Sequence, residues 1–442
     1  MSTTASPLDA LGRSALDLRW HFDPVAGSRA GVAAADERLG DFTADAVRQH
    51  VAALRAIASA VEDAELESLD DELDRTILLN ALRSDAGILE REQPFTRDPG
   101  RWMRHAEDAL AVLLDAAPDE GDVRDALLGR VLALPAFLGG LRETVSRPAP
   151  EFVAAALQGA TRVALRLDAA RQRLAGHAVE GSADPAQAVA AAADALARTG
   201  RWLADECASA ETPHAYAIGI ERFERRLHEQ HALASSAAEL WRVGLRLREE
   251  TEGELELAAA ELEPGTPWRD VIAPLVGDAV ARALRRPAPP LEPEAAASET
   301  RRMFPSPVTA RGLDLVVQER LAAGFDAADH RIAMLTDRLL HALLLELDVA
   351  LHTRGMLAGD AVAQLEGALP LTRTDAALLV QRLCAEPTRG LEGAVGRRDL
   401  LQLEADVRAA EGAAYDPERF FARFRRFGLA PVSLMRWGMG LE

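Results

Sequence analysis

Two side chains that could exchange a proton stand four residues apart, Asp348 and His352. Residues at this spacing share one face of an α-helix, so the carboxylate could orient the imidazole. His352 could then act as a general acid–base, while Arg338 or Arg311 binds an anionic substrate. The alternative is a structural network of hydrogen bonds between helices. The sequence leaves both interpretations open.

A second candidate site is the acidic sequence DDELD at residues 70–74. Asp70, Asp71 and Asp74 match a DDxxD pattern, whose carboxylates could hold Mg²⁺ and a diphosphate. Such a site would also need a second acidic cluster, which the sequence lacks, and an aromatic lining, for which aromatic residues are scarce. The alternative is a helix N-terminus, where acidic side chains offset the macrodipole. A Mg²⁺–diphosphate-binding enzyme therefore stays an alternative function.

The histidines show no recognisable metal motif. No HExxH occurs, and the nearest pattern is His228 and His231, which lack an evident third ligand. His330, His341 and His352 are spaced by eleven, which places neighbours ~16 Å apart on one helix, too far to share an ion. All fifty basic residues are arginine, so no lysine is present to form a Schiff base or to complete a P-loop. We therefore expect no metal and no cofactor.

The composition limits the possible partners. The net charge of the 442-residue chain is −20, and its arginine runs are short and mixed with acids, which argues against a nucleic-acid partner. No run of eighteen apolar residues exists, so we expect no membrane-spanning helix. The first twenty residues lack a signal peptide's basic start and apolar run, and a cytoplasmic location is expected.

Helical periodicity dominates the positions of the apolar residues. They recur at i, i+3, i+4 and i+7, the spacing of an amphipathic helix, while alternating β-branched runs are nearly absent. The pattern covers residues 70–91, 150–175, 184–209, 236–262, 325–353 and 397–412. The sequence therefore predicts an all-α fold with little or no sheet.

A stretch rich in proline and alanine divides the chain. Residues 285–310 contain this stretch and predict a linker. The expected organisation is an N-terminal helical lobe over residues 1–284 and a C-terminal helical lobe over residues 311–442. We expect the two lobes to share a central cleft.

The order of several segments resembles a known family. They are residues 22–45, 74–101, 130–153, 219–244, 337–355 and 386–442. Together they resemble a large bacterial family of uncharacterised all-helical proteins that is related to zinc peptidases of the gluzincin type. Its members are often described as carboxypeptidase-like. The resemblance implies a helical peptidase-like scaffold around a cleft.

The departures from that family bear on function. The resemblance places the zinc motif between Arg285 and Gly312, where this sequence has no histidine. It places the third zinc ligand at Arg311 and a tyrosine near Gly393. A gluzincin needs three protein ligands and a glutamate base, so we expect a degenerate member that is not a zinc peptidase.

The function expected from the sequence is therefore binding without catalysis. A metal-free, peptidase-like helical protein would bind a peptide or a small molecule in its cleft. The alternatives are an enzyme of another class, which uses Asp348 and His352 as its acid–base pair, and the Mg²⁺–diphosphate enzyme. Whether any catalysis survives is left open, and the sequence does not give the oligomeric state.

Overall fold

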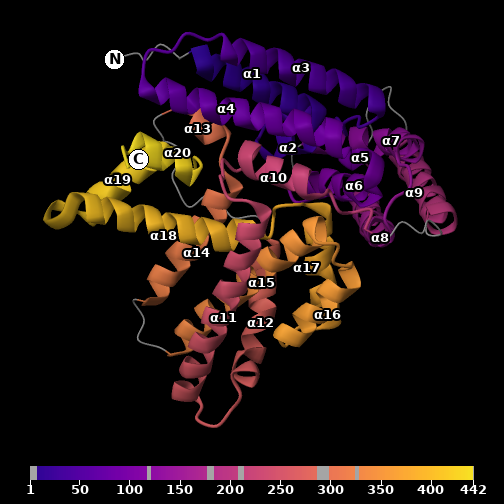
Figure 1. Cartoon of the computed structure of the whole chain (residues 1–442). Coiled ribbons are helices and arrows are strands. Elements are labelled where there is room, and N and C mark those ends of the chain that lie inside the picture. The colour runs from indigo at the N-terminus through magenta and orange to yellow at the C-terminus, as the bar shows by residue number, and fades with distance from the viewer. Residues whose placement is uncertain are drawn as a thin grey trace. The chain divides into compact units, whose positions relative to one another are not determined.

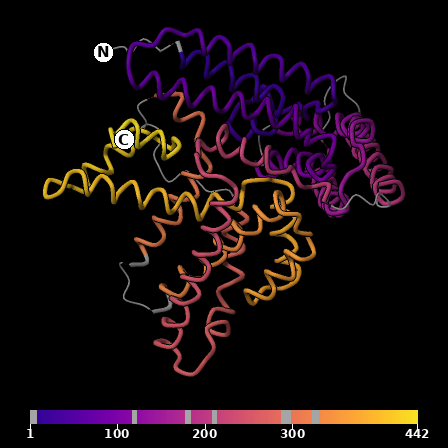
Figure 2. The backbone as a smooth tube through the Cα atoms, in the orientation of Figure 1, coloured from indigo at the N-terminus to yellow at the C-terminus, as the bar shows by residue number. Residues whose placement is uncertain are grey.

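The computed structural model describes residues 7–116, 121–176, 184–207, 214–285, 298–323 and 328–441. These residues form α-helices with short 3₁₀ and π segments, and no strand occurs among them (Figure 1). The all-α fold predicted from the sequence is confirmed. Figure 2 traces the same backbone and marks the segments outside these ranges in grey. None of the described helices combines the length and apolar character needed to cross a membrane.

The helices follow one another with short connections. In chain order they are α1 (Pro7–Phe22), α2 (Pro24–Arg29), α3 (Ala44–Glu62), α4 (Leu69–Gly87), α5 (Pro94–Arg97), α6 (Pro99–Leu114), α7 (Gly121–Thr144), α8 (Pro150–Arg173), α9 (Pro185–Trp202), α10 (Ile220–Glu229), α11 (Ala237–Leu262), α12 (Trp268–Leu284), α13 (Glu299–Met303), α14 (Pro307–Ala323), α15 (Ala328–Thr353), α16 (Ala358–Ala368), α17 (Arg373–Ala385), α18 (Leu391–Glu411), α19 (Pro417–Phe427) and α20 (Val432–Gly438). A π-helical turn, η2 (Ile88–Glu92), follows α4.

The chain forms two compact units. The first contains Met1–Gly12, Val61–Ser84 and Ala217–Glu442, and the second contains Arg13–Ala60 and Asp85–Tyr216. The boundaries expected from the sequence, at residues 284 and 311, both fall within the first unit. Residues 286–297 of the expected linker lie outside the described residues, and its remainder contains α13 and the start of α14.

Helix α15 forms the centre of the first unit. Helices α11, α12, α17 and α18 all pack against it. Its leucines are buried around the whole circumference, since 0% of the surface of each of these is exposed: Leu339, Leu340, Leu343, Leu345, Leu347 and Leu351. A helix that is apolar all round belongs in a core, and the polar residues that α15 also carries are therefore buried with it.

Helices α14 and α18 cross at two glycines in the first unit. A Cβ atom on Gly312 would lie 2.6 Å from the Cα of Gly396, closer than real Cβ atoms approach another heavy atom. The two backbones can meet only because neither residue has a side chain. This crossing brings Arg311 of α14 and Glu392 of α18 to the same side of α15.

An aromatic cluster organises the second unit. The rings of Phe42 and Phe95 stack with centroids 4.0 Å apart, and Trp102 donates a hydrogen bond of 2.9 Å from its Nε1 to the carbonyl of Phe95. Gln93, between η2 and α5, has a left-handed backbone with φ 52°. That turn directs α5 back under α3, and a groove described below lies between them.

Candidate functional site

Asp348 and His352 lie side by side on α15. Nε2 of His352 is 3.6 Å from Oδ1 of Asp348, and both side chains are fully buried. The same nitrogen is 3.0 Å from the carbonyl oxygen of Leu383 in α17. Because a carbonyl only accepts, this nitrogen carries the proton. The pair expected from the i, i+4 spacing is thus present, in surroundings that exclude solvent.

The carboxyl group of Asp348 holds the segment before α18. Oδ1 accepts a hydrogen bond of 3.2 Å from the backbone N–H of Thr388, and Oδ2 accepts one of 2.8 Å from that of Gly390. Thr388 has φ 73°, which is unusual for a β-branched residue. Burial raises the pKa of Asp348 to about 8, although the two N–H groups act in the opposite direction.

His231 holds the same segment from the other side. Its Nε2 is 2.9 Å from Oγ1 of Thr388, which donates in turn to the carbonyl of Pro387. Burial, assisted by Arg226, lowers the pKa of His231 to about 3. His228, its partner in the nearest metal pattern of the sequence, is exposed. The two histidines therefore lie in different environments.

The two arginines expected to bind substrate are engaged elsewhere. Arg311, whose exposed fraction is 3%, donates to the carbonyls of Arg282 and Arg285 at the C-terminal end of α12. The carbonyl of Arg282 also accepts a hydrogen bond of 3.2 Å from the backbone N–H of Arg285, so Arg311 adds a side-chain donor to the C-terminal end of the helix. Arg338 forms two hydrogen bonds, of 3.0 and 3.2 Å, with the carboxylate of Glu254 in α11.

A small polar cavity lies where α12, α14, α15, α17 and α18 meet. Its volume is ≈ 20 Å³, enough for about one water-sized particle. Five charged or titratable side chains line it: Arg311, His341, Arg382, Arg389 and Glu392. Burial raises the pKa of Glu392 to about 7 and, together with Arg311 and Arg389, lowers that of His341 to about 3.

Sequence reasoning missed most of this cavity. Arg382, Arg389 and Glu392 belong to no motif, and His341 drew notice only for its spacing. The available signal was the tyrosine that the resemblance expects near Gly393, because that position borders the cavity.

The acidic residues at the start of α4 bind an arginine. Nε of Arg301 is 2.7 Å from Oδ1 of Asp74, and its Nη2 is 2.8 Å from Oδ1 of Asp70. Asp71 faces away and accepts a hydrogen bond from the hydroxyl of Ser68. The acids lie in the first two turns of the helix, as the helix N-terminus interpretation expects, and two of them neutralise one buried guanidinium.

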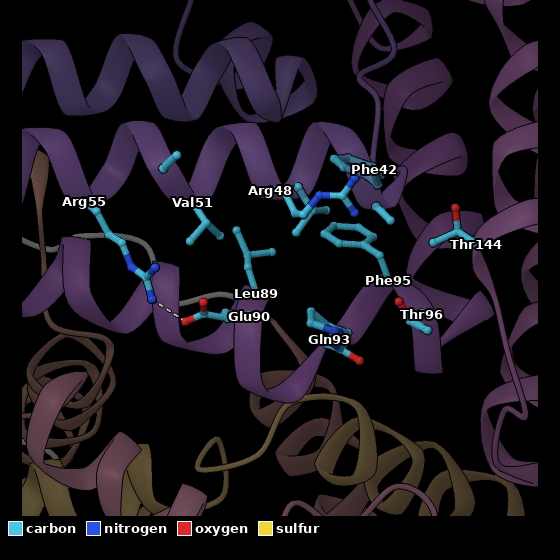
Figure 3. A pocket seen from close by; sticks show the side chains of 14 residues that line it. Phe42, Arg48, Val51, Arg55, Leu89, Glu90, Gln93, Phe95, Thr96 and Thr144 are labelled. Atoms are coloured by element: carbon cyan, nitrogen blue, oxygen red, sulfur yellow. Dashed lines mark hydrogen bonds and ion pairs between the residues drawn. The ribbon is translucent and has the colours of Figure 1, made fainter.

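The second unit contains a concave site much larger than the small cavity of the first unit. A groove of ≈ 470 Å³ lies between α3 and the segment formed by η2 and α5 (Figure 3). Residues of α3 line one wall at helical spacing: Ala44, Val47, Arg48, Val51, Ala52 and Arg55. Leu89, Pro94 and Phe95 form the facing wall, and an ion pair between Arg55 and Glu90 crosses one end.

Comparison with known proteins places the chain in a family. A family described as "bacterial protein of unknown function (DUF885)" matches residues 24–298 and 318–439. The chain belongs to this family. The interval between the two matched ranges contains Arg311. No curated protein matches the chain.

Two solved structures share the fold of this DUF885 member. Both are described as a "putative lipoprotein", one from Shewanella oneidensis and one from Colwellia psychrerythraea. The first has a TM-score of 0.77 at 16% identity and covers 98% of this chain and 100% of its own. The second has a TM-score of 0.76 at 11% identity and covers 98% of each chain. The uncharacterised bacterial family expected from the sequence is confirmed, while its relation to gluzincins stays a prediction.

The residues at the expected zinc positions do not fit a metal site. Arg311, where the resemblance places the third ligand, carries a positive charge and only donates hydrogen bonds. Its donors are directed to the end of α12. Within the described ranges, no group of three or more His, Cys, Asp or Glu side chains is placed to hold an ion.

Proposed function

We propose that this chain binds a small molecule or a short peptide and does not carry out zinc-dependent hydrolysis. The observation that supports binding is the groove of the second unit, because ≈ 470 Å³ lies within the ~300–1,000 Å³ of ligand pockets. The position of Arg311 supports the second part of the proposal, because an arginine stands where the resemblance places the third zinc ligand.

The lining of the groove favours an amphipathic anion with an apolar body. Phe42, Val51, Leu89 and Phe95 are each at least nine-tenths buried and supply an apolar floor. Arg48 points along the groove toward the rings of Phe42 and Phe95 (Figure 3). It pairs with Asp45, but both side chains are more than 70% exposed. Surface pairs of this kind contribute little, so a ligand carboxylate or sulfonate can take the place of Asp45.

A fluorescent aromatic anion, 8-anilinonaphthalene-1-sulfonate, tests this proposal on the full chain. We expect saturable binding to one site, the groove. The apolar floor should provide most of the binding free energy, because each 100 Å² of apolar surface removed from water contributes about 2.5 kcal/mol. Ala52 lines the groove and is exposed, so A52W fills the groove without disturbing the core. Affinity should fall at least about tenfold. A60W places the same side chain at an exposed position of α3 outside the groove and serves as the control.

The role of Arg48 is tested by comparing the binding of a negatively charged dye with that of an uncharged dye. R48A should weaken binding of the sulfonate but leave binding of an uncharged dye, Nile red, within about twofold. The proposal is wrong if A52W and A60W bind the sulfonate equally well. It is also wrong if zinc-supplemented protein cleaves unmodified peptides at a rate proportional to its bound zinc.

A further inference from the structure

The small cavity of the first unit contains donors that the described residues leave unsatisfied. Nη1 of Arg389 binds the carboxylate of Glu386 at 2.9 Å, but Nη2 is buried and has no hydrogen-bond partner. His341, which is 7% exposed, lines the same cavity. Buried polar groups without a partner are rare in native proteins and indicate a bound water or ion.

The charges around the cavity favour an anion over a water. Arg311, Arg382 and Arg389 line it, and Glu386 is shared by the last two at 3.1 and 2.9 Å. The nearest acid to Arg311 is Asp314 at 3.5 Å. Three guanidinium groups thus face the carboxylates of Glu386 and Asp314 together with Glu392. The site carries an excess of positive charge whenever Glu392 is protonated, and in a buried site that excess strengthens attraction for a negative ion.

We propose that this cavity binds a small monovalent anion of the size of chloride, held by Arg389 beside His341 and Glu392, with the charge of Arg311 nearby. A volume of ≈ 20 Å³ admits an ion of one or two atoms and excludes a larger carboxylate. The site would hold an anion where the resemblance expects a metal cation. It is separate from the groove of the second unit, so either proposal can fail alone.

Anion binding is expected to be coupled to proton uptake. The charged or titratable groups around Glu392 are Arg389, Glu386, Arg382, Arg311 and the buried carboxyl of Asp348, with neutral His341 across the cavity. An anion beside Glu392 favours its protonated form, which can also donate a hydrogen bond to the ion. Because burial already raises the pKa of Glu392 to about 7, affinity should increase as the pH falls from 8 to 6.

Thermal unfolding in sodium chloride and in sodium gluconate at equal ionic strength tests the proposal. Chloride and bromide should raise the Tm of the full chain by roughly 1–2 °C over gluconate when present at several times Kd, and more at pH 6 than at pH 8. R389Q should abolish this difference. R373Q is the matched control, since Arg373 is 81% exposed and does not line the cavity.

A second variant and a direct measurement of chloride binding test the proposal even if R389Q fails to fold. E392Q should still bind chloride but lose the dependence of binding on pH. Line broadening of ³⁵Cl in NMR should be seen with the unmodified protein and with R373Q. Equal Tm values in chloride and gluconate at pH 6, with no line broadening, would show that the cavity holds water only and overturn the proposal.

Discussion

The imidazole of His341 on α15 fills the space beside Gly393 on α18. A Cβ atom on Gly393 would lie 2.6 Å from the Cγ of His341, so no side chain fits there while the ring keeps its place. The resemblance to gluzincins expects a tyrosine near this glycine. A bulky side chain at position 393 and the observed position of His341 exclude each other, and the two positions are therefore sterically coupled.

Replacing Gly393 by alanine should destabilise the first unit. The new methyl group overlaps the ring of His341, and overpacking of this kind costs about 1–3 kcal/mol in the free energy of unfolding. The control is G277A in α12, where nothing lies within 4 Å of the new Cβ. That variant should be neutral or gain about 0.5–1 kcal/mol. Urea denaturation gives both values.

The coupling predicts a specific departure from additivity. The double variant H341A/G393A should be less destabilised than the sum of its single variants, because the alanine at 341 leaves room for the new methyl group. Additive losses would show that the ring can move aside without cost, and that the observed contact does not define the two positions.

Asp348 should make the protein less stable as the pH rises. Its pKa is about 8 in the folded state and near 3.8 when unfolded, so the folded chain retains a proton that the unfolded chain releases. Its contribution is complete below pH 4 and is lost between about pH 4 and 8, at about 1.4 kcal/mol per pH unit. D348N should remove this slope. Urea denaturation midpoints of the unmodified protein and of D348N, measured from pH 6.5 to 8.5, give the two slopes to be compared.

The contacts of the Asp348 carboxyl group show which features could be predicted from the sequence and which could not. Helical spacing correctly placed Asp348 beside His352, because residues i and i+4 always share a face. The same local rule could not predict that the backbone N–H groups of Thr388 and Gly390 would approach the carboxylate. Those contacts join segments forty residues apart, and they depend on the packing of α18 on α15.

The fold class and the candidate sites differed in what the sequence could reveal. Apolar periodicity predicted helices because it reports burial along one segment. The small cavity is formed by five helices, and none of its residues has a distinctive sequence neighbourhood. Arg311 was recognised only through its place in a family pattern, and nothing local indicated that its guanidinium would donate to the carbonyls of Arg282 and Arg285 at the end of α12.

Buried histidines should make the protein sensitive to acid. The folded-state pKa of His231 is about 3 and that of His50 about 4, both below the usual 6.5 because of burial. The unfolded chain therefore binds protons first, and their contribution to stability is present above pH 6.5 and lost as the pH falls. H231Q keeps a donor for Thr388 but cannot titrate. It should reduce the slope of stability between pH 6 and 4.5 by about 1.4 kcal/mol per pH unit; an unchanged slope would contradict this.

The two acids that bind Arg301, Asp74 and Asp70, should contribute unequally to the free energy of unfolding. The guanidinium is 1% exposed, Asp74 is 8% exposed and Asp70 is 53% exposed at the side chain. D74A leaves a buried charge without its buried partner and should cost about 3–5 kcal/mol, whereas D70A should cost about 1 kcal/mol or less. If the Mg²⁺–diphosphate alternative holds, diphosphate must raise the Tm only with Mg²⁺ present, and D70A must abolish that shift.

Arg311 should stabilise the end of α12 and leave the chain without a zinc site. R311M removes the donors to the carbonyls of Arg282 and Arg285 and should lower the free energy of unfolding by about 1–3 kcal/mol. R311K, which keeps the charge but carries its N–H donors on a single nitrogen, should recover part of that loss. Elemental mass spectrometry of protein expressed with zinc should find less than about a tenth of an equivalent in all three proteins. Near one equivalent in the unmodified protein, lost on chelation together with stability, would show that the zinc ligands lie at positions other than those the resemblance assigns.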